Sequence, residues 1–224
     1  MKKKYTAKEV RNLILDTASV LFIEKGYEQT SISDIVAGLD GLTRGAVYHH
    51  FESKYHIIVG IAKRFIPEQE LLDSIDKRDD LSGLGKIQTL LLESMFNEDI
   101  TKSTVISLSL LKDPIFTSIY NAQMCEVFVP IIEKYIHAGN ADGSITVPQS
   151  AQMAEVVILL TSTWFIQTLF PNTAESFFEK LKTAQYVLKV SGIDVLSDEV
   201  CSTIVQKLTG NSRQQEGAAD EKNL

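Results

Sequence analysis

The sequence predicts an all-α protein, because apolar residues recur at helical spacing along most of the chain. Two segments also begin with a Ser or Thr that is followed three residues later by an acidic residue, which is typical of helix starts. We find no segment with the alternation expected of a β-strand. The chain has 224 residues, of which 44% are hydrophobic, so it can build one large domain or two small ones.

The first helix is predicted to follow Thr6 and to end at Lys25–Gly26. Thr6 and Glu9 form a capping box, in which each side chain bonds to the other residue's backbone amide. Lys25 places a positive charge at the carboxyl end, and Gly26 can adopt the left-handed conformation that ends a helix. Between the two caps runs an apolar stripe of Val10, Leu13, Ile14, Ala18, Leu21 and Phe22.

Two short helices joined by a glycine-containing turn are predicted next. Ser31 and Asp34 form a second capping box, residues 38–41 form the turn, and Thr43 caps a third helix that runs to about His50. This third helix carries small and polar residues where a core helix would carry leucines. The pair suits a helix-turn-helix whose second helix enters the DNA major groove.

A fourth helix is predicted from Ser53 toward Pro67, which cannot continue a helix. Residues 139–144 form the clearest loop of the second half, and the polar residues 210–224 are expected to be disordered. Further helices are predicted over residues 84–96, 104–111, 114–138, 149–170, 174–190 and 197–208.

Charge is distributed unevenly along the chain. The whole sequence has 22 basic and 29 acidic residues, a net charge of −7. Residues 1–66 hold ten basic and seven acidic residues (net +3), whereas residues 67–224 hold 12 basic and 22 acidic residues (net −10). This asymmetry is expected if only the first part meets phosphates, although an ordinary surface also fits it.

The predicted third helix presents residue types that read DNA. Arg44 can pair with guanine edges or with phosphate, and the two small residues after it allow the backbone to come close. Tyr48 and His49 lie about one turn further on, and Lys54 stands where its charge and the start of the fourth helix both favour a phosphate. We therefore expect DNA contacts from Thr30, Ser31, Ser33, Thr43, Arg44, Gly45, Ala46, Tyr48, His49 and Lys54.

Other roles stay open for several of these residues. Thr43 and Ser31 cap helices whether or not DNA is present, and Tyr48 can pack partly into the core. His49 and His50 could form half of a metal site. No second His/Cys cluster accompanies them in the sequence, so we expect no metal ion and no cofactor.

Residues 41–51 read GLTRGAVYHHF and are followed by Ser53 and Lys54. With their surroundings they resemble the signature of the tetracycline-repressor (TetR) family of bacterial regulators, over roughly residues 7–60. One departure is visible: the turn between Ile35 and Gly45 is one residue longer than the commonest pattern of the family. The upstream positions that fit the resemblance are Ala18, Phe22, Gly26, Thr30, Ile35 and Val36.

The resemblance implies an all-helical homodimer that binds a double-stranded DNA operator. Residues 1–66 would form the helix-turn-helix DNA-binding domain, residues 67–210 a ligand-binding and dimerisation domain, and residues 211–224 a disordered tail. The second domain diverges across the family, so its ligand residues do not carry over. In the family, DNA is commonly touched by the residues that match Thr43, Gly45, Tyr48, His49 and Lys54.

Residues 149–170 are apolar around most of the predicted helix, and such a helix is buried on all sides. Polar residues interrupt its apolar run, so we expect a buried helix and no membrane span. With residues 174–190 it could pair with a second copy as a four-helix bundle, or both helices could be core of one chain. The expected dimer interface consists of Met153, Val157, Leu160, Phe177, Leu181 and Leu188.

A ligand pocket in the second domain would need apolar walls and a few polar groups. The helices over residues 114–138 and 149–170 should pack together, although aromatic residues there could also be plain core. The candidate ligand-binding residues are Phe96, Phe116, Tyr120, Met124, Phe128, Trp164 and Gln167.

The expected function is a ligand-responsive transcriptional regulator, a repressor that an unidentified small molecule releases from a palindromic operator. The alternatives are a helical protein-binding adaptor and an all-helical enzyme, but we recognise no catalytic constellation in the sequence. Cys125 and Cys201 lie far apart in apolar contexts, and no secretory signal is recognised at the start. We therefore expect a cytoplasmic protein with two reduced thiols.

Overall fold

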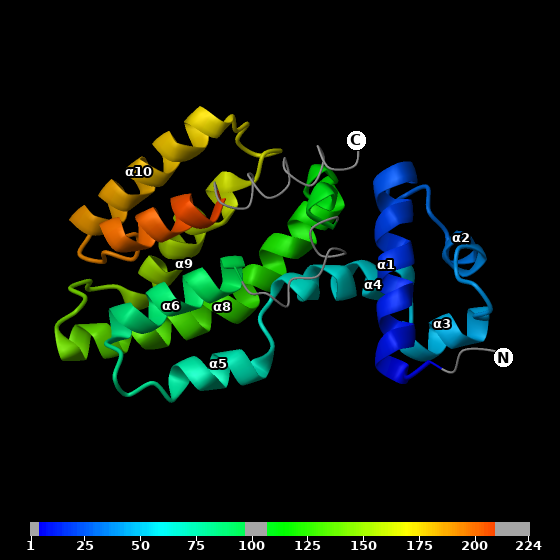
Figure 1. Ribbon diagram of the computed structural model, residues 1–224, viewed down its shortest axis with the longest axis horizontal. Helices are drawn as coiled ribbons and strands as arrows, with labels where there is room; N and C mark the ends of the chain where they lie inside the picture. The colour runs from blue at the N-terminus through cyan, green and yellow to red at the C-terminus, as the bar shows by residue number, and fades with distance from the viewer. Residues whose placement is uncertain (1–4, 97–106, 209–224) are drawn as a thin grey trace, which may run out of the picture. The chain divides into compact units, whose positions relative to one another are not determined.

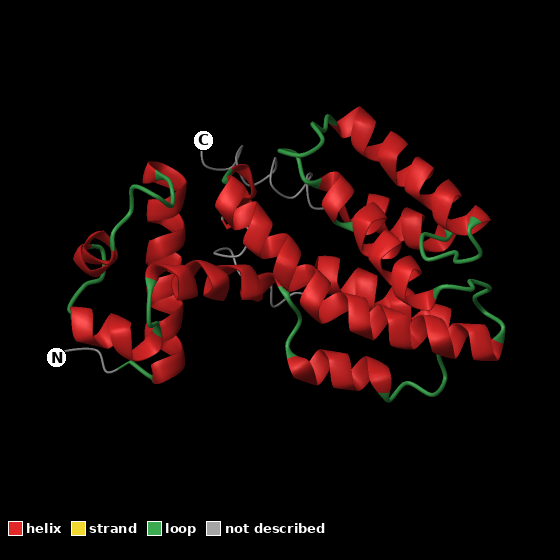
Figure 2. Ribbon diagram, turned by 180° about the vertical axis from the view of Figure 1, so that it is seen from behind, coloured by secondary structure: helices red, strands yellow, loops and turns green. Residues whose placement is uncertain are grey.

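The structure is a computed structural model, which describes residues 5–96 and 107–208. All secondary structure within these ranges is helical, and Figure 2 shows helices and loops but no strand among them. The all-α prediction is confirmed. The chain divides into two compact units, the first made of Met1–Pro67, Glu98–Val127 and Ile166–Leu169, and the second of Glu68–Asn97, Phe128–Phe165 and Phe170–Leu224.

The first unit begins with the four helices that the sequence predicts (Figure 1). Thr6 and Glu9 form the expected capping box at the start of α1, with Glu9 Oε2 accepting from the Thr6 amide across 2.7 Å. Gly26 ends α1 with a φ of 85°, which is a left-handed conformation that favours glycine. The elements are α1 (Ala7–Lys25), α2 (Ile32–Ala37), α3 (Arg44–His50), α4 (Lys54–Ala62) and a 3₁₀-helix, η1 (Lys63–Phe65).

The long turn between α2 and α3 is accommodated by a short α2. This helix ends at Ala37, and Leu39 turns back into the core, where it is buried. A Cβ atom at Gly38 would lie 2.8 Å from Thr17 Cγ2, so only glycine allows α1 and the turn to come this close. Gly41 has a φ of 74° and reverses the chain before α3.

The core of the first unit is continuous and apolar. Ile14, Leu15 and Phe22 of α1 lie in this core, together with Phe51, which follows the end of α3. The same core includes residues from two later elements, η2 (Leu108–Lys112) and the start of α8 (Pro114–Asp142). Those later residues are Leu110, Phe116 and Ile119.

The second unit is also helical, and α8 contributes its later residues to this unit. Lys134 pairs with Asp76 across 2.5 Å and ties α5 to α8, while the Gly83 amide donates to Asp142 and joins the start of α6 to the end of α8. Its further elements are α5 (Gln69–Asp76), α6 (Gly83–Phe96), α9 (Ser150–Thr161), η3 (Thr163–Phe165), α10 (Ala174–Val190) and helical residues 198–208.

The structure differs from the predicted helices in three places. The sequence did not predict α5. The loop expected over residues 139–144 is partly helix, because Asn140 and Asp142 stabilise the end of α8 by bonding to Val147 and to the Gly83 and Ser144 amides. The helix expected over residues 149–170 stops at Thr161, and the chain continues through η3. The start of the helix expected over residues 104–111, and the tail from 210 onward, lie outside the described residues.

By length and composition, α8 is apolar enough to cross a membrane. A core helix of a soluble protein passes the same test, and α8 contributes buried residues to both units.

Candidate nucleic-acid interface and ligand cavity

The helix α3 lies on the surface of the first unit and is anchored by one side chain. Val47 is fully buried, whereas Arg44, Tyr48 and His49 are exposed. Thr43 caps the helix by accepting from the Ala46 amide across 3.2 Å. The helix therefore offers its other face to a binding partner while the fold holds it in place.

Arg44 and Tyr48 interact with each other on this face. Arg44 Nη2 donates to the Tyr48 phenol oxygen across 3.3 Å, and the guanidinium carbon lies 5.5 Å from the centre of the ring. The nearest neighbour of a Cβ atom at Gly45 would be Thr43 Oγ1 at 3.7 Å, so packing does not require glycine there. The small residue leaves the surface beside Arg44 open to close approach.

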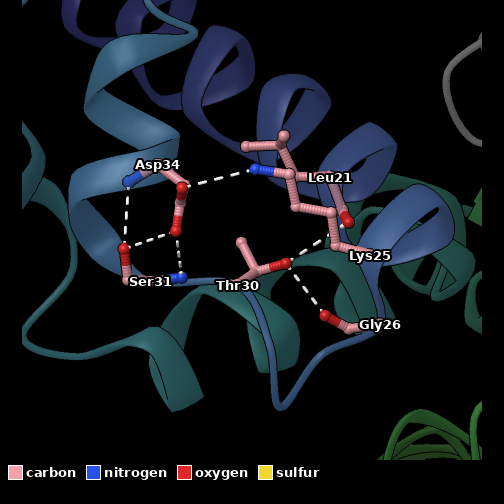
Figure 3. Close-up of polar contacts among 6 residues, drawn as sticks. All are labelled: Leu21, Lys25, Gly26, Thr30, Ser31 and Asp34. Atoms are coloured by element: carbon pink, nitrogen blue, oxygen red, sulfur yellow. Dashed lines mark hydrogen bonds and ion pairs between the residues drawn. The ribbon is translucent and has the colours of Figure 1, made fainter.

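The connection from α1 to α2 is fixed by a second set of polar contacts, drawn in Figure 3. The Ser31 amide and hydroxyl both donate to Asp34 Oδ2, at 2.8 and 2.5 Å, and Lys25 Nζ lies 3.3 Å from Asp34 Oδ1. Hydrogen bonds from the Ser31 hydroxyl and amide, followed by one from Lys25, lower the pKa of Asp34 to about 2. Ser33 is exposed beside this cap.

Thr30 does not reach the surface, which corrects one expected DNA contact. Its side chain is 1% exposed, and its hydroxyl donates to the Gly26 carbonyl across 2.9 Å and lies 3.3 Å from the Leu21 carbonyl (Figure 3). The Thr30 hydroxyl thus links the loop before α2 to the end of α1. The sequence could not separate Thr30 from Ser31, because both are hydroxyl residues next to a helix start.

Lys54 is held by the same loop. Its Nζ donates to the Tyr27 and Glu28 carbonyls at 2.7 and 3.2 Å and lies 4.3 Å from the centre of the Tyr27 ring. This lysine therefore joins the start of α4 to the end of α1. Its contact with a phosphate stays a prediction.

His49 and His50 are neighbours at the end of α3, with ring centroids 5.3 Å apart. Burial, followed by the nearby His49 and Arg11, lowers the pKa of His50. This histidine is therefore neutral at neutral pH. Within α3, Arg44 is then the residue with a permanent positive charge.

The candidate ligand residues are divided between the two units. Phe116 is fully buried and packs against Phe65 and Tyr120, with ring centroids 6.3 and 6.4 Å away, inside the core of the first unit. Met124 and Phe128 are also buried, and Gln167 is exposed. Phe116, Met124 and Phe128 thus fill core positions, and a ligand-binding role for the candidate residues stays a prediction.

A cavity of about 80 Å³ lies instead within the second unit. Its walls come from α6, α9, η3, α10 and the segment beyond α10. Trp164 and Phe96, both expected to line a pocket, are sequence neighbours of cavity residues and are not in the wall. The lining residues are Leu91, Met95, Thr161, Phe165, Phe177, Leu181, Leu196 and Ile204.

The expected dimer residues are also mostly internal. Val157, Leu181 and Leu188 are at most 6% exposed within one chain, and Phe177 lines the cavity. Met153 and Leu160 are partly buried. The large apolar side chains that α9 and α10 do expose are Leu159, Tyr186 and Val190.

Comparison with known proteins finds similarity over the first part of the chain. The family described as bacterial regulatory proteins, tetR family, matches residues 14–61. The chain is 34% identical over 96 residues to the probable HTH-type transcriptional regulator ArpR of Pseudomonas putida, covering 42% of this chain and 45% of that protein. It is 38% identical over 102 residues to the HTH-type transcriptional regulator AcrR of Shigella flexneri, covering 44% and 47%. The matched region thus spans about half the length of these curated relatives.

Solved structures resemble most of the chain. NalD, the secondary repressor of the MexAB-OprM multidrug efflux pump in Pseudomonas aeruginosa, has a TM-score of 0.60 at 20% identity, covering 83% of this chain and 96% of that chain. A γ-butyrolactone receptor (ArpA-like protein) has a TM-score of 0.59 at 16% identity, covering 90% and 98%. At these identities the likeness shows a shared fold.

Proposed function

We propose that this chain, which belongs to the tetR family of bacterial regulatory proteins, is a ligand-responsive transcriptional regulator that acts as a repressor. Two copies of α3 would occupy successive major grooves of a palindromic operator, about 34–36 Å apart. The observation that carries this proposal is the exposed Arg44–Tyr48 pair on a helix anchored by buried Val47. An arginine placed in this way can pair with the O6 and N7 atoms of guanine.

The proposed DNA surface comprises one continuous part of the first unit. Thr43, Arg44, Gly45, Tyr48 and His49 would contact the groove and its flanking phosphates. Ala46 is partly buried on the same helix, and Ser31 and Ser33 lie beside it at the exposed start of α2. Each side chain can donate or accept hydrogen bonds to phosphate or present a small apolar surface to a base.

The proposed homodimer uses the exposed apolar side chains of the second unit. Tyr186 and Val190, which lie one turn apart on α10, are 67% and 64% exposed, and Leu159 on α9 is 49% exposed. Burying such side chains is the main driving force of association. Two copies related by a two-fold axis would bring these side chains together in an interface of like residues.

An effector would act by binding the second unit of the protein. If the bound form holds the two reading helices at the wrong separation, operator affinity falls by a coupling free energy on the order of 1–3 kcal/mol. We propose that such a molecule releases the operator and that the protein works in the cytoplasm without catalysing a reaction. A protein-binding adaptor, the rival function, would need no salt-dependent affinity for DNA.

The decisive experiment is a binding titration on an operator duplex selected from random sequences. We expect Arg44→Ala and Tyr48→Ala to weaken binding, about 10- to 100-fold for the arginine, which corresponds to roughly 1–3 kcal/mol for a bidentate contact with a base. Arg78→Ala is the matched control, since Arg78 is an exposed arginine that pairs with Asp80 in the second unit. Wild-type affinity for both α3 variants, or wild-type protein that ignores duplexes in dilute buffer, would refute the proposal.

A further inference from the structure

Among the described residues, no charged side chain lines the cavity in the second unit. Among the described residues that line it, seven have apolar side chains and Thr161 alone carries a polar group. The Thr161 hydroxyl already donates its hydrogen to the Val157 carbonyl across 2.7 Å. An ionised ligand would lose its hydration in this cavity and gain no partner, which is a large free-energy cost.

The basic side chains near the cavity are held outside its wall. Lys180 donates to the carbonyl oxygens of Trp164 and Phe170 at 3.4 and 3.1 Å, and also bonds to the Asn172 side chain. Lys207 Nζ lies 5.0 Å from the centre of the Phe96 ring. Both ammonium groups therefore have other partners, and neither residue belongs to the lining.

One side of the cavity is aromatic. The rings of Phe165 and Phe177 lie 5.1 Å apart at an angle of 59°, and this pair continues to Trp164 at 6.4 Å and to Phe178 at 5.6 Å. Aromatic rings prefer such tilted contacts because the positive edge of one ring meets the negative face of another. A further ring inside the cavity would extend this series.

The size of the cavity suits a small occupant. Its volume is about 80 Å³, several times the roughly 10–15 Å³ that one water molecule needs. An apolar wall offers water too few hydrogen bonds, so such cavities stay dry and take up apolar molecules. Met95 can adjust its flexible side chain around the bound molecule.

We infer that this cavity is a binding site for a small, uncharged aromatic molecule, about one ring in size. The occupant would contact Phe165 and Phe177 through its ring and would be held by apolar contact alone. Its link to operator release rests on the function proposed above, whereas binding itself does not depend on DNA.

Benzene is the probe for a test with the full-length chain. The chain has one tryptophan, Trp164, next to Phe165 of the cavity wall, so its fluorescence should report occupancy. We expect a saturable change in Trp164 fluorescence and a rise in melting temperature as benzene is added, because a ligand that binds the folded state stabilises it. Benzoate and benzylammonium should bind at least tenfold more weakly than benzene.

Two variants fill the cavity from α6 and one variant is their control. Leu91→Phe and Met95→Phe replace partly buried lining residues, and each should weaken benzene binding at least tenfold. Leu108→Phe makes the same kind of change at a 47% exposed site in η2 of the first unit and should leave binding unchanged. The comparison of benzene with its charged derivatives uses the unaltered chain, so it decides the matter even if a variant does not fold.

Three results would overturn the inference. They are the lack of a saturable response to benzene, an equal response in the cavity-filling variants and in Leu108→Phe, and binding of benzoate or benzylammonium as tight as that of benzene. A separate titration of operator DNA distinguishes the two proposals. If benzene binds but operator affinity does not change, the cavity site stands and its regulatory role fails; if the chain does not bind DNA at all, the proposed function fails and the cavity site is unaffected.

Discussion

Arg44 is positioned by Tyr48, one turn further along α3. The guanidinium carbon lies 5.5 Å from the tyrosine ring centre, and Nη2 donates to the phenol oxygen across 3.3 Å. A free arginine side chain samples many rotamers, and ordering it on binding costs free energy. The tyrosine lowers this cost by holding the guanidinium near one position on the exposed face.

A double-mutant cycle on this pair should reveal the coupling. Arg44→Ala, Tyr48→Ala and the double variant are compared by titration against the selected operator. A cation–π contact at an exposed site is worth roughly 0.5–1 kcal/mol. The sum of the binding free energies lost in the two single variants should therefore exceed the loss in the double variant by about 0.5–1 kcal/mol. Tyr48→Phe keeps the ring and should retain most of the coupling. Strictly additive losses would show that the pair does not act as a unit on DNA.

Thr30 should matter for stability and not for DNA contact. Its buried hydroxyl donates to the Gly26 carbonyl, and Thr30→Val keeps the shape but leaves that carbonyl without this donor. The free energy of unfolding, measured in urea, should fall by about 1–2 kcal/mol. Operator affinity of the folded protein should not change. Ser33→Ala, at an exposed position, is the control that should leave stability unaltered. A stable Thr30→Val variant with weakened operator binding would contradict this assignment.

The Ser31–Asp34 cap should make the first unit sensitive to acid. The pKa of Asp34 falls from 3.8 to about 2 in the folded state, chiefly because Ser31 donates two hydrogen bonds to it. A lowered folded-state pKa adds stability that is fully present above about pH 3.8 and is lost as the pH falls toward 2. Asp34→Asn should therefore lower the melting temperature at pH 7, and the difference from wild type should shrink below pH 4. Asp40→Asn, in the exposed turn, should not show this profile. A difference that stays constant between pH 7 and pH 2 would rule out the carboxylate as its source.

Two glycines of α6 should respond in opposite ways to the same substitution. A methyl group at Gly83 would overlap the backbone of Gly139 and the Tyr135 carbonyl, so Gly83→Ala should destabilise the protein by roughly 1–3 kcal/mol. At Gly85 the nearest atom to an added Cβ is Ser82 Oγ at 3.4 Å, which is ordinary contact. Gly85→Ala should be neutral or stabilising by up to about 1 kcal/mol, because alanine favours helix. Denaturant unfolding of both variants checks this, and equal losses would mean that the close approach of α6 and α8 is not a constraint.

The helices and caps of the first unit could be predicted from sequence because their signals are local. Thr6, Ser31 and Thr43 each cap the helix that follows them, as the spacing of their partners indicates. The end of α8 could not be predicted in this way. Asn140 belongs to a residue type that usually marks loops, and only its contact with Val147 in the folded chain shows that it completes a helix.

Helical periodicity alone could not identify the ligand-binding and dimer-interface residues. Leu181 and Tyr186 are both large residues with apolar surface on α10, yet one is 6% exposed and the other 67% exposed. Helical spacing predicts that one face is apolar, but it does not tell a core position from a cavity wall or an interface. Phe116 shows the same limit, because an aromatic residue suits a pocket and a core equally well in sequence.

The later chain segments within the first unit limit how this unit can be combined with parts of other proteins. The apolar core that contains residues of α1 and α4 also includes Leu110, Phe116 and Ile119. These three residues follow Pro67 by more than forty positions in the sequence. A fragment cut after residue 66 would lose these three core residues, expose part of the apolar core and tend to aggregate. A chimaera that joins the first unit to the second unit of another protein therefore has to include η2 and the first turns of α8. The transferred part then consists of two separate stretches of sequence.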